Sequence, residues 1–358
     1  MPSLKEIKGR INSISSTLAI TSAMKMVAAA KLQKAQMAIQ NMLPYERRLH
    51  SMLIDLMGAM NISAAASEDG SVRGSGSAER GFDQSGDRLS LSNRHDLAGM
   101  DGAYSLMAQR EVHKVAIVAF ASNSSLCGAF NSNAIREATA VINEYRASGL
   151  GDADITVYSV GRKMAEAMKK LGFPSPADFT KMSDSPSYDA ASALAQELFD
   201  GFVSGRFDKV ELVYNHYKST SSQPTTRQTY LPLSLADATA DIQVGKITDS
   251  ASESDTNRGA EPVGAPVVRQ GSPTTEDLIV EPSKEELIAT LLPKVIRLRI
   301  FTTLLDSAAA EHAARTVAMQ LATDNGNDLL QELTLEYNKG RQQKITSEIL
   351  DLVGGSMQ

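Results

Sequence analysis

The chain has 358 residues, 42% of them hydrophobic, and a formal net charge of −6 at pH 7. This length is enough for one large domain or two modest ones, and the acidic balance argues against a nucleic-acid-binding protein, which normally carries a basic domain. The single cysteine, Cys127, excludes an internal disulfide and a CxxC site and favours a reducing compartment, and no run of about 20 apolar residues is available to span a bilayer.

Residues 1–61 are predicted to form one long helix that pairs with another helix. Ser3 and Glu6 match the S-x-x-E capping box that begins many helices. Apolar residues then recur at alternating spacings of three and four, which is the pattern of a coiled-coil seam. The seam positions are Leu4, Ile7, Ile11, Ile14, Leu18 and Thr21.

The stretch AITSAMKMVAAAKL, residues 19–32, carries small apolar side chains around nearly its whole circumference, unlike an ordinary surface helix. Basic residues also outnumber acidic residues within the first 61 positions. A basic helix of this kind either contacts an acidic neighbour or presents a solvated face, and the charge alone leaves both readings open.

The middle of the chain, residues 106–242, is predicted to be an α/β domain. Strand patterns cover residues 113–122, 154–161, 209–219 and 227–233, and helix patterns cover residues 134–147, 162–171 and 188–204. Strands that alternate with helices of this length predict a mainly parallel sheet with right-handed crossovers. A further strand pattern, DLIVEP, predicts an edge strand of the same domain within residues 276–282.

Two polar segments interrupt this pattern, residues 62–105 and residues 243–275. Both are rich in Ser, Gly and Asp, and such segments bury too little apolar surface to order themselves. We interpret both as flexible insertions, and the first as a surface loop without chemistry of its own.

Residues 283–358 are predicted to form a second long helix, which pairs with the first. Ser283 and Glu286 repeat the capping box, and Gly354-Gly355 is expected to end the helix. The seam positions are Leu291, Val295, Leu298, Thr302, Leu305, Ala309, His312, Thr316, Met319, Leu330, Leu333, Tyr337, Ile345, Ile349 and Leu352. If the two helices pair, they run antiparallel and protrude from the α/β domain as a rod.

No motif in the chain indicates catalysis. The loop SSLCGAFN lies where a dinucleotide-binding fold places its phosphate loop, but it lacks G-x-G-x-x-G, and a tight turn at Gly128 explains it better. The five histidines form no metal-ligand spacing and no Ser-His-Asp or Cys-His arrangement. Residues 323–327, TDNGN, indicate either a locally weak exposed turn or a surface that faces a partner. This pattern favours a mechanical or binding role.

Both ends of the chain resemble the gamma subunit of F-type ATP synthase. The resemblance rests on SLKEIKGRINSISSTLAITSAMKMVAAAKLQKAQ near the N-terminus and on AEHAARTVAMQLATDNGNDLLQELTLEYNKGRQQKITSEILDLVGGS near the C-terminus, with LCGAFN between them. It implies an α/β protein in which a long antiparallel coiled coil of the N- and C-terminal helices joins a Rossmann-like, mainly parallel α/β domain.

The resemblance also implies a rotor. In this family the coiled coil enters the hexamer of alpha and beta subunits, and the α/β domain lies with the epsilon subunit on the membrane-embedded c ring. Ion flow turns the c ring and the shaft, and the shaft drives the beta subunits through ATP synthesis or hydrolysis. The gamma subunit is itself not an enzyme and needs no cofactor or metal, and the coupling ion, proton or sodium, is set by the c ring.

The family's partner contacts carry over to seven positions. Met24 and Lys25 match positions that face an acidic lever of the beta subunit, and Arg341 and Gln342 match a pair that hydrogen-bonds a beta loop. Three further positions match residues used for coupling and rotor contacts, namely Arg315, Thr346 and Glu348. The apolar end around residues 349–353 corresponds to the tip that turns inside an apolar collar.

Some residues depart from the family pattern. Asn123-Ser124-Ser125 stands where relatives usually carry Asp-Arg-Gly, and Gly340 and Gly355 stand where relatives usually carry alanine. The insertions lack the cysteine pair of the light-regulated plastid form. A start at Met1 without a presequence favours the cytoplasmic face of a bacterial inner membrane, bound peripherally. From the residues alone, a self-associating coiled-coil tether and a nucleotide-dependent enzyme stay open as alternatives.

Overall fold

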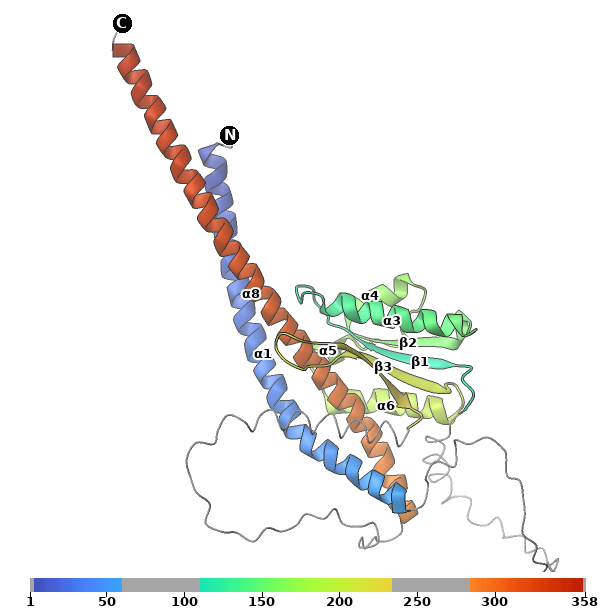
Figure 1. Cartoon of the computed structure of the whole chain (residues 1–358). Helices are drawn as coiled ribbons and strands as arrows, with labels where there is room; N and C mark the ends of the chain where they lie inside the picture. Colours follow the sequence, from blue (N-terminus) through green and yellow to red (C-terminus); the bar gives the residue numbers. More distant parts are fainter. Residues whose placement is uncertain (1–2, 60–109, 234–283, 357–358) are drawn as a thin grey trace, which may run out of the picture.

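Two long antiparallel helices and a small α/β domain make up the described part of the chain. The computed structural model describes residues 3–59, 110–233 and 284–356. Helices α1 (Leu4–Ala59) and α8 (Lys284–Ser356) lie side by side, with both chain ends at the same end of the molecule (Figure 1). The predicted architecture is therefore confirmed. The predicted insertions, 62–105 and 243–275, and the predicted edge strand at 276–282 lie outside the described residues.

The predicted seam of α1 is the side that packs against α8. Between residues 3 and 21, only the six predicted positions are shielded from solvent, and Ile7 is the most buried of them. On α8, shielded positions recur at 316, 319, 323, 326, 330, 333, 337 and 340. Thr323 donates a hydrogen bond to Thr21 across the seam at 3.2 Å. The stretch at residues 323–327 is thus regular helix, with Thr323 and Gly326 inside the seam.

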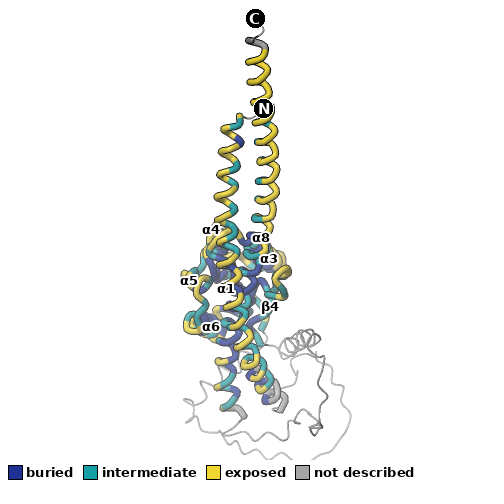
Figure 2. Tube along the Cα trace, turned by 90° about the vertical axis from the view of Figure 1, so that its left-hand side faces the viewer, coloured by how far each residue is buried: buried dark blue, intermediate teal, exposed yellow. Residues whose placement is uncertain are grey.

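Helix α8 extends beyond the start of α1. Gly340 lies against Leu4, so the residues of α8 that follow Gly340 have no neighbouring helix among the described residues. Ile345, Ile349 and Leu352 continue the predicted seam. Their side chains are exposed because α1 begins at Leu4, beside Gly340, and does not extend along this part of α8. The figure coloured by burial shows this exposed end clearly (Figure 2).

The prediction that Gly354-Gly355 ends the second helix is wrong. Helix α8 runs through both glycines to Ser356. Glycine ends a helix when it adopts a left-handed conformation just after the last turn. The glycines with positive φ in the described residues include neither of these two, so nothing in their backbone interrupts the helix.

The sheet has the order β2-β1-β3-β4. Strand β1 (Val115–Phe120) lies between β2 (Ile155–Val160) and β3 (Lys209–Asn215) and pairs with both in parallel, whereas β4 (Thr225–Leu231) is antiparallel to β3. The predicted mainly parallel sheet is confirmed. A parallel strand covered on both faces reads as a continuous apolar run, and β1, with the sequence VAIVAF, is buried at every position.

Helices cover both faces of the sheet. On the outer face, α3 (Phe130–Ala147) and α4 (Arg162–Lys170) follow β1 and β2 and pack into one apolar cluster. The inner face packs on α6 (Tyr188–Val203), on the first half of α8 and on the second half of α1. A short 3-10 turn, η2 (Asp152–Asp154), and the unpredicted α5 (Thr180–Asp184) complete the domain. The inner cluster fixes the domain to the base of the coiled coil.

A buried charge network holds the outer face of the sheet near its edge. The Glu211 side chain is only 2% exposed and accepts hydrogen bonds from Arg227 at 2.7 Å and from the Tyr145 hydroxyl at 2.6 Å. Lys209 pairs with the same carboxylate at 2.7 Å. Burial alone would raise the pKa of Glu211, but these three partners lower it below its ordinary value.

Candidate functional site

The seven predicted contact residues fall into two groups. Met24 and Lys25 on α1 lie with Arg315 on α8 where the coiled coil leaves the α/β domain, and we call this region the junction. The other four, Arg341, Gln342, Thr346 and Glu348, lie on the exposed end of α8, which we call the tip. The structure therefore brings the first group together and leaves the second group apart from it.

An open cavity of about 300 Å³ lies at the junction. Its walls come from α1, from α8 and from the loop between β1 and α3. The residues that line it are Ala23, Met24, Val27, Ala28, Lys31, Ser124, His312 and Arg315. The small side chains of the AITSAMKMVAAAKL stretch leave this space open because they do not fill the gap between the helices.

The loop between β1 and α3 is a tight turn, as predicted from Gly128. Gly128 has φ of 58° and Leu126 has φ of 70°, so two residues in the left-handed region reverse the chain within a few positions. The side chain of Asn131 on α3 holds the start of this loop, because its Oδ1 accepts a hydrogen bond from the Ser122 backbone N–H at 2.9 Å. The turn places Ser124 beside α8.

Arg315 is held inside the chain at the junction. Its guanidinium donates to Glu311 at 2.7 Å and to the Ser124 hydroxyl at 2.8 Å, and its side chain is only 12% exposed. Burial raises the pKa of the Glu311 carboxyl, and the positive charge of Arg315 opposes that rise. The same guanidinium also lies 3.5 Å from the Ser125 carbonyl, so the arginine of α8 is held against the loop between β1 and α3.

Lys25 reaches across the seam. Its ammonium donates a hydrogen bond to the side-chain carbonyl of Gln320 on α8 at 2.8 Å, and the Gln320 amide donates to Asp324. Met24 beside it is partly buried and lines the cavity. The exposed apolar residues Ile20 and Val27 of α1 surround this pair with a surface that offers few hydrogen bonds.

Sequence reasoning assigned no role at the junction to Lys31, His312 or Glu311. The only indication in the sequence is that His312, a polar residue, stands at a seam position of α8 where an apolar residue is expected. Burial and the nearby charges of Arg315 and Lys31 lower the pKa of His312 to about 4, so the imidazole is neutral at physiological pH. Its Nδ1 has no hydrogen-bond partner among the described residues.

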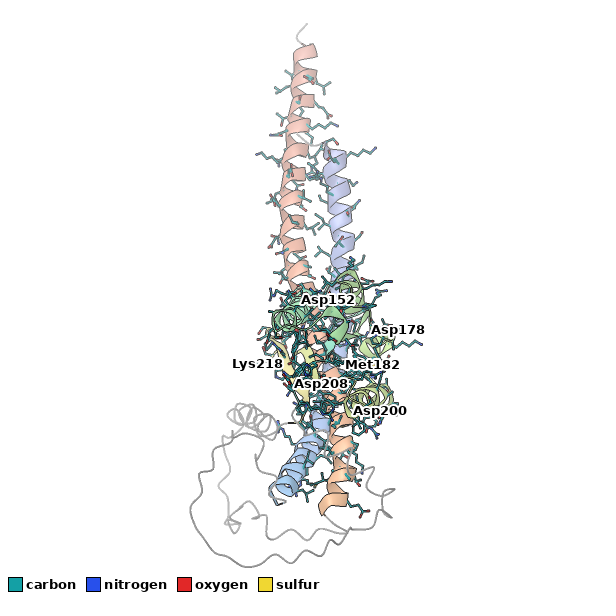
Figure 3. All side chains as sticks on the ribbon, turned by 90° about the vertical axis from the view of Figure 1, so that its right-hand side faces the viewer. Asp152, Asp178, Met182, Asp200, Asp208 and Lys218 are labelled. Atoms are coloured by element: carbon teal, nitrogen blue, oxygen red, sulfur yellow. The ribbon has the colours of Figure 1, made fainter. Side chains whose placement is uncertain are left out.

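The tip is a single exposed helix. All residues from 341 to 353 are exposed, and side chains project from it in every direction (Figure 3). The polar contacts here are short-range, because Thr346 donates to the Gln342 carbonyl at 2.9 Å and Lys344 pairs with Glu348 at 3.8 Å. Between them lie apolar residues that are also exposed, namely Ile345, Ile349, Leu350, Leu352 and Val353.

Within residues 3–59, 110–233 and 284–356, no three His, Cys, Asp or Glu side chains lie close enough together to hold a metal ion. None of the helices in these same ranges is long and apolar enough to cross a membrane. What the described site offers is a surface on which apolar and charged side chains alternate, suited to contact with other proteins.

Comparison with known proteins identifies the relatives of this chain. A sequence model described as ATP synthase matches residues 3–357. The ATP synthase gamma chain of Phocaeicola vulgatus is 47% identical over 357 residues, and that of Bacteroides thetaiotaomicron is 45% identical over 358 residues; each alignment covers 100% of both chains.

A solved structure has the same fold. One chain of the mitochondrial ATP synthase of Euglena gracilis, from a structure of OSCP, F1 and the c ring in rotational state 3, matches with a TM-score of 0.52 at 18% identity. The match covers 99% of this chain and 93% of that chain. From the family model and the full-length relatives, the chain belongs to the ATP synthase gamma-chain family.

Proposed function

We propose that the chain is the central rotor shaft of an F-type ATP synthase and performs no catalysis itself. The c ring, driven by ions, would turn the α/β domain, and the coiled coil would pass this rotation to the beta subunits of the alpha/beta hexamer. There the changing contacts would alter the affinity for nucleotides during ATP synthesis or hydrolysis.

The observation that carries this proposal is the exposed end of α8. Five large apolar side chains between residues 345 and 353 lie on a helix without a neighbour among the described residues. Apolar surface of this extent normally contacts another protein. Four of the five side chains at residues 349–353 are apolar, and such a surface suits a helix end that turns inside a collar, because strong directional hydrogen bonds at one angle would oppose rotation.

At the junction, we assign the contact with beta to Met24 and Lys25. Lys25 donates to Gln320, which is itself exposed, so an acidic side chain of a partner could replace that neutral acceptor. A charged acceptor makes a stronger hydrogen bond than a neutral one. Arg315 would act less directly, because Glu311 and Ser124 already hold its guanidinium.

At the tip, we assign contacts with the hexamer to Arg341, Gln342, Thr346 and Glu348. Arg341 is fully available for a partner's acceptor, since it lies on the exposed helix just beyond Gly340. The chain would assemble with alpha, beta, epsilon and the c ring on the cytoplasmic face of a bacterial inner membrane, held there peripherally through the c ring.

Reconstitution tests the rotor function. The chain is mixed with alpha and beta subunits of a close relative, and the complex is isolated and assayed for ATP hydrolysis with and without the chain. One copy per hexamer and a dependence of hydrolysis on the chain are expected. A chain that binds only copies of itself would instead support the tether, although the seam of α1 is already packed against α8 within one chain.

A substitution tests the tip. Arg341→Ala is expected to lower ATP synthesis in the assembled enzyme while assembly is preserved, because a contact with the hexamer is lost. Lys339→Ala, an exposed basic residue two positions away, serves as the matched control and should leave synthesis unchanged. Equal rates for Arg341→Ala and the parent would remove the assignment.

A further inference from the structure

The segment that leaves β3 touches both long helices. His216 and Tyr217 follow the strand directly, and Lys218, next along the chain, marks the position of this segment in Figure 3. The backbone N–H of Tyr217 donates to Asp306 on α8 at 2.9 Å. Its hydroxyl accepts a hydrogen bond from Gln36 on α1 at 2.6 Å. One residue of the domain thus bonds to α1 and to α8 at once.

The Tyr217 ring also packs between two apolar clusters. One cluster joins Leu32 of α1 to Ala309 and Ala313 of α8. The other joins Cys127 and Phe130 of the domain to Ala310 of α8, and the Tyr217 ring lies against both. The alanines of α8 explain this placement, because small side chains let an aromatic ring approach the backbone of the helix closely.

His216 adds a side-chain contact at the same point on α8. Its Nδ1 lies 2.6 Å from the Asp306 carboxylate, whose other oxygen accepts the Tyr217 N–H. Asp306 is mostly buried, with 18% of its side chain exposed. A hydrogen bond to a mostly buried carboxylate resists displacement more than an exposed pair does.

We propose that His216 and Tyr217 form a joint through which rotation of the α/β domain is passed to both helices of the coiled coil. The inference rests on the rotor function proposed above. The inner apolar cluster also fixes the domain to both helices, but apolar side chains can slide past each other. Hydrogen bonds from one residue to both helices have preferred directions, and they hold α1 and α8 at a fixed angle to the domain.

The first experiment measures this angle in the full chain. Spin labels are attached to cysteines introduced at the exposed positions Lys34 on α1 and Lys170 on α4, and the distribution of distances between them is recorded by pulsed electron resonance. Tyr217→Phe, alone and combined with His216→Ala, is expected to broaden the distribution. The control is Tyr145→Phe, which removes a tyrosine hydroxyl bonded to Glu211 on the outer face of the sheet, away from both helices.

The second experiment measures coupling in the assembled ATP synthase. Tyr217→Phe is expected to lower ATP-driven ion pumping relative to ATP hydrolysis, and Tyr145→Phe is expected to leave this ratio unchanged. A Tyr217→Phe distance distribution as narrow as that of the parent overturns the joint, and so does a broadened distribution with an unchanged pumping ratio. Failure of the parent chain to assemble with alpha and beta overturns the rotor function instead, and the distance measurement on the free chain separates the two results.

Discussion

The two glycines in the seam of α8 are expected to respond in opposite ways to the same substitution. Alanine is favoured over glycine inside a helix by about 1 kcal/mol, so Gly→Ala should stabilise an exposed helix by that amount. At a seam position, the added methyl group must also fit against α1.

The fit differs between the two sites. A Cβ at Gly326 would lie 2.6 Å from Leu18 Cδ2 and 3.1 Å from Leu18 Cγ, well inside normal contact distance. Overpacking of this kind costs about 1–3 kcal/mol, so Gly326→Ala should be neutral or destabilising by up to about 2 kcal/mol. At Gly340 the nearest atom is Leu4 Cδ2 at 3.1 Å, in the first turn of α1, where the side chain can move aside. Gly340→Ala should therefore stabilise the chain by about 0.5 kcal/mol.

Urea unfolding of the full chain, followed by far-ultraviolet circular dichroism, measures both changes. A double-mutant cycle completes the test, because Leu18→Ala makes room for the new methyl group and Gly326→Ala should then become stabilising. Equal effects of alanine at the two glycines, or no coupling between Gly326 and Leu18, would refute the assignment of Gly326 to a close-packed seam.

Three more predictions concern ionisable side chains and the stability of the chain. Arg227→Ala should cost about 3 kcal/mol in urea unfolding, because it leaves the buried Glu211 carboxylate with fewer partners; a cost below about 1 kcal/mol would mean that Glu211 is solvated. Asp306 raises the pKa of His216, so the stability from this pair is complete below pH 6.5 and is lost as pH rises through the higher pKa of the folded state; His216→Asn should abolish that loss, and a slope unchanged by the substitution would contradict it. The pH dependence of stability that His312 contributes has the opposite sign, because the pKa of His312 falls from 6.5 to about 4 on folding. The free energy of unfolding should therefore fall as pH drops across that interval. A His312→Gln variant that kept the same slope would exclude His312 as the cause.

The sequence alone determined the main elements of this protein. The seam of α1 and the strands of the sheet were predictable because periodicity is a local property: it reports which side of a helix or strand is apolar, whatever covers that side. The family resemblance was carried by the two ends of the chain, which the comparisons with full-length relatives confirm.

Other features depended on contacts between distant parts of the chain. The apolar pattern of α1 places Leu18 in a seam, but it could not show that Gly326 of α8 is its neighbour. The apolar pattern of α8 continues past Gly340, although α1 begins beside Gly340 and offers no partner beyond it. The periodicity of one helix does not specify its register against another helix or the residue at which the contact between them ends.

The junction and the joint were decided by tertiary structure for the same reason. Arg315 was predicted as a contact residue, but its partner Ser124 lies 191 positions earlier in the chain, and Gln36 and Tyr217 are 181 positions apart. Such pairs depend on the positions of the sheet, of the loop between β1 and α3 and of both long helices. The sequence determined which segments are helices and strands, and packing determined which side chains meet, because a contact between distant residues depends on the position of every element between them.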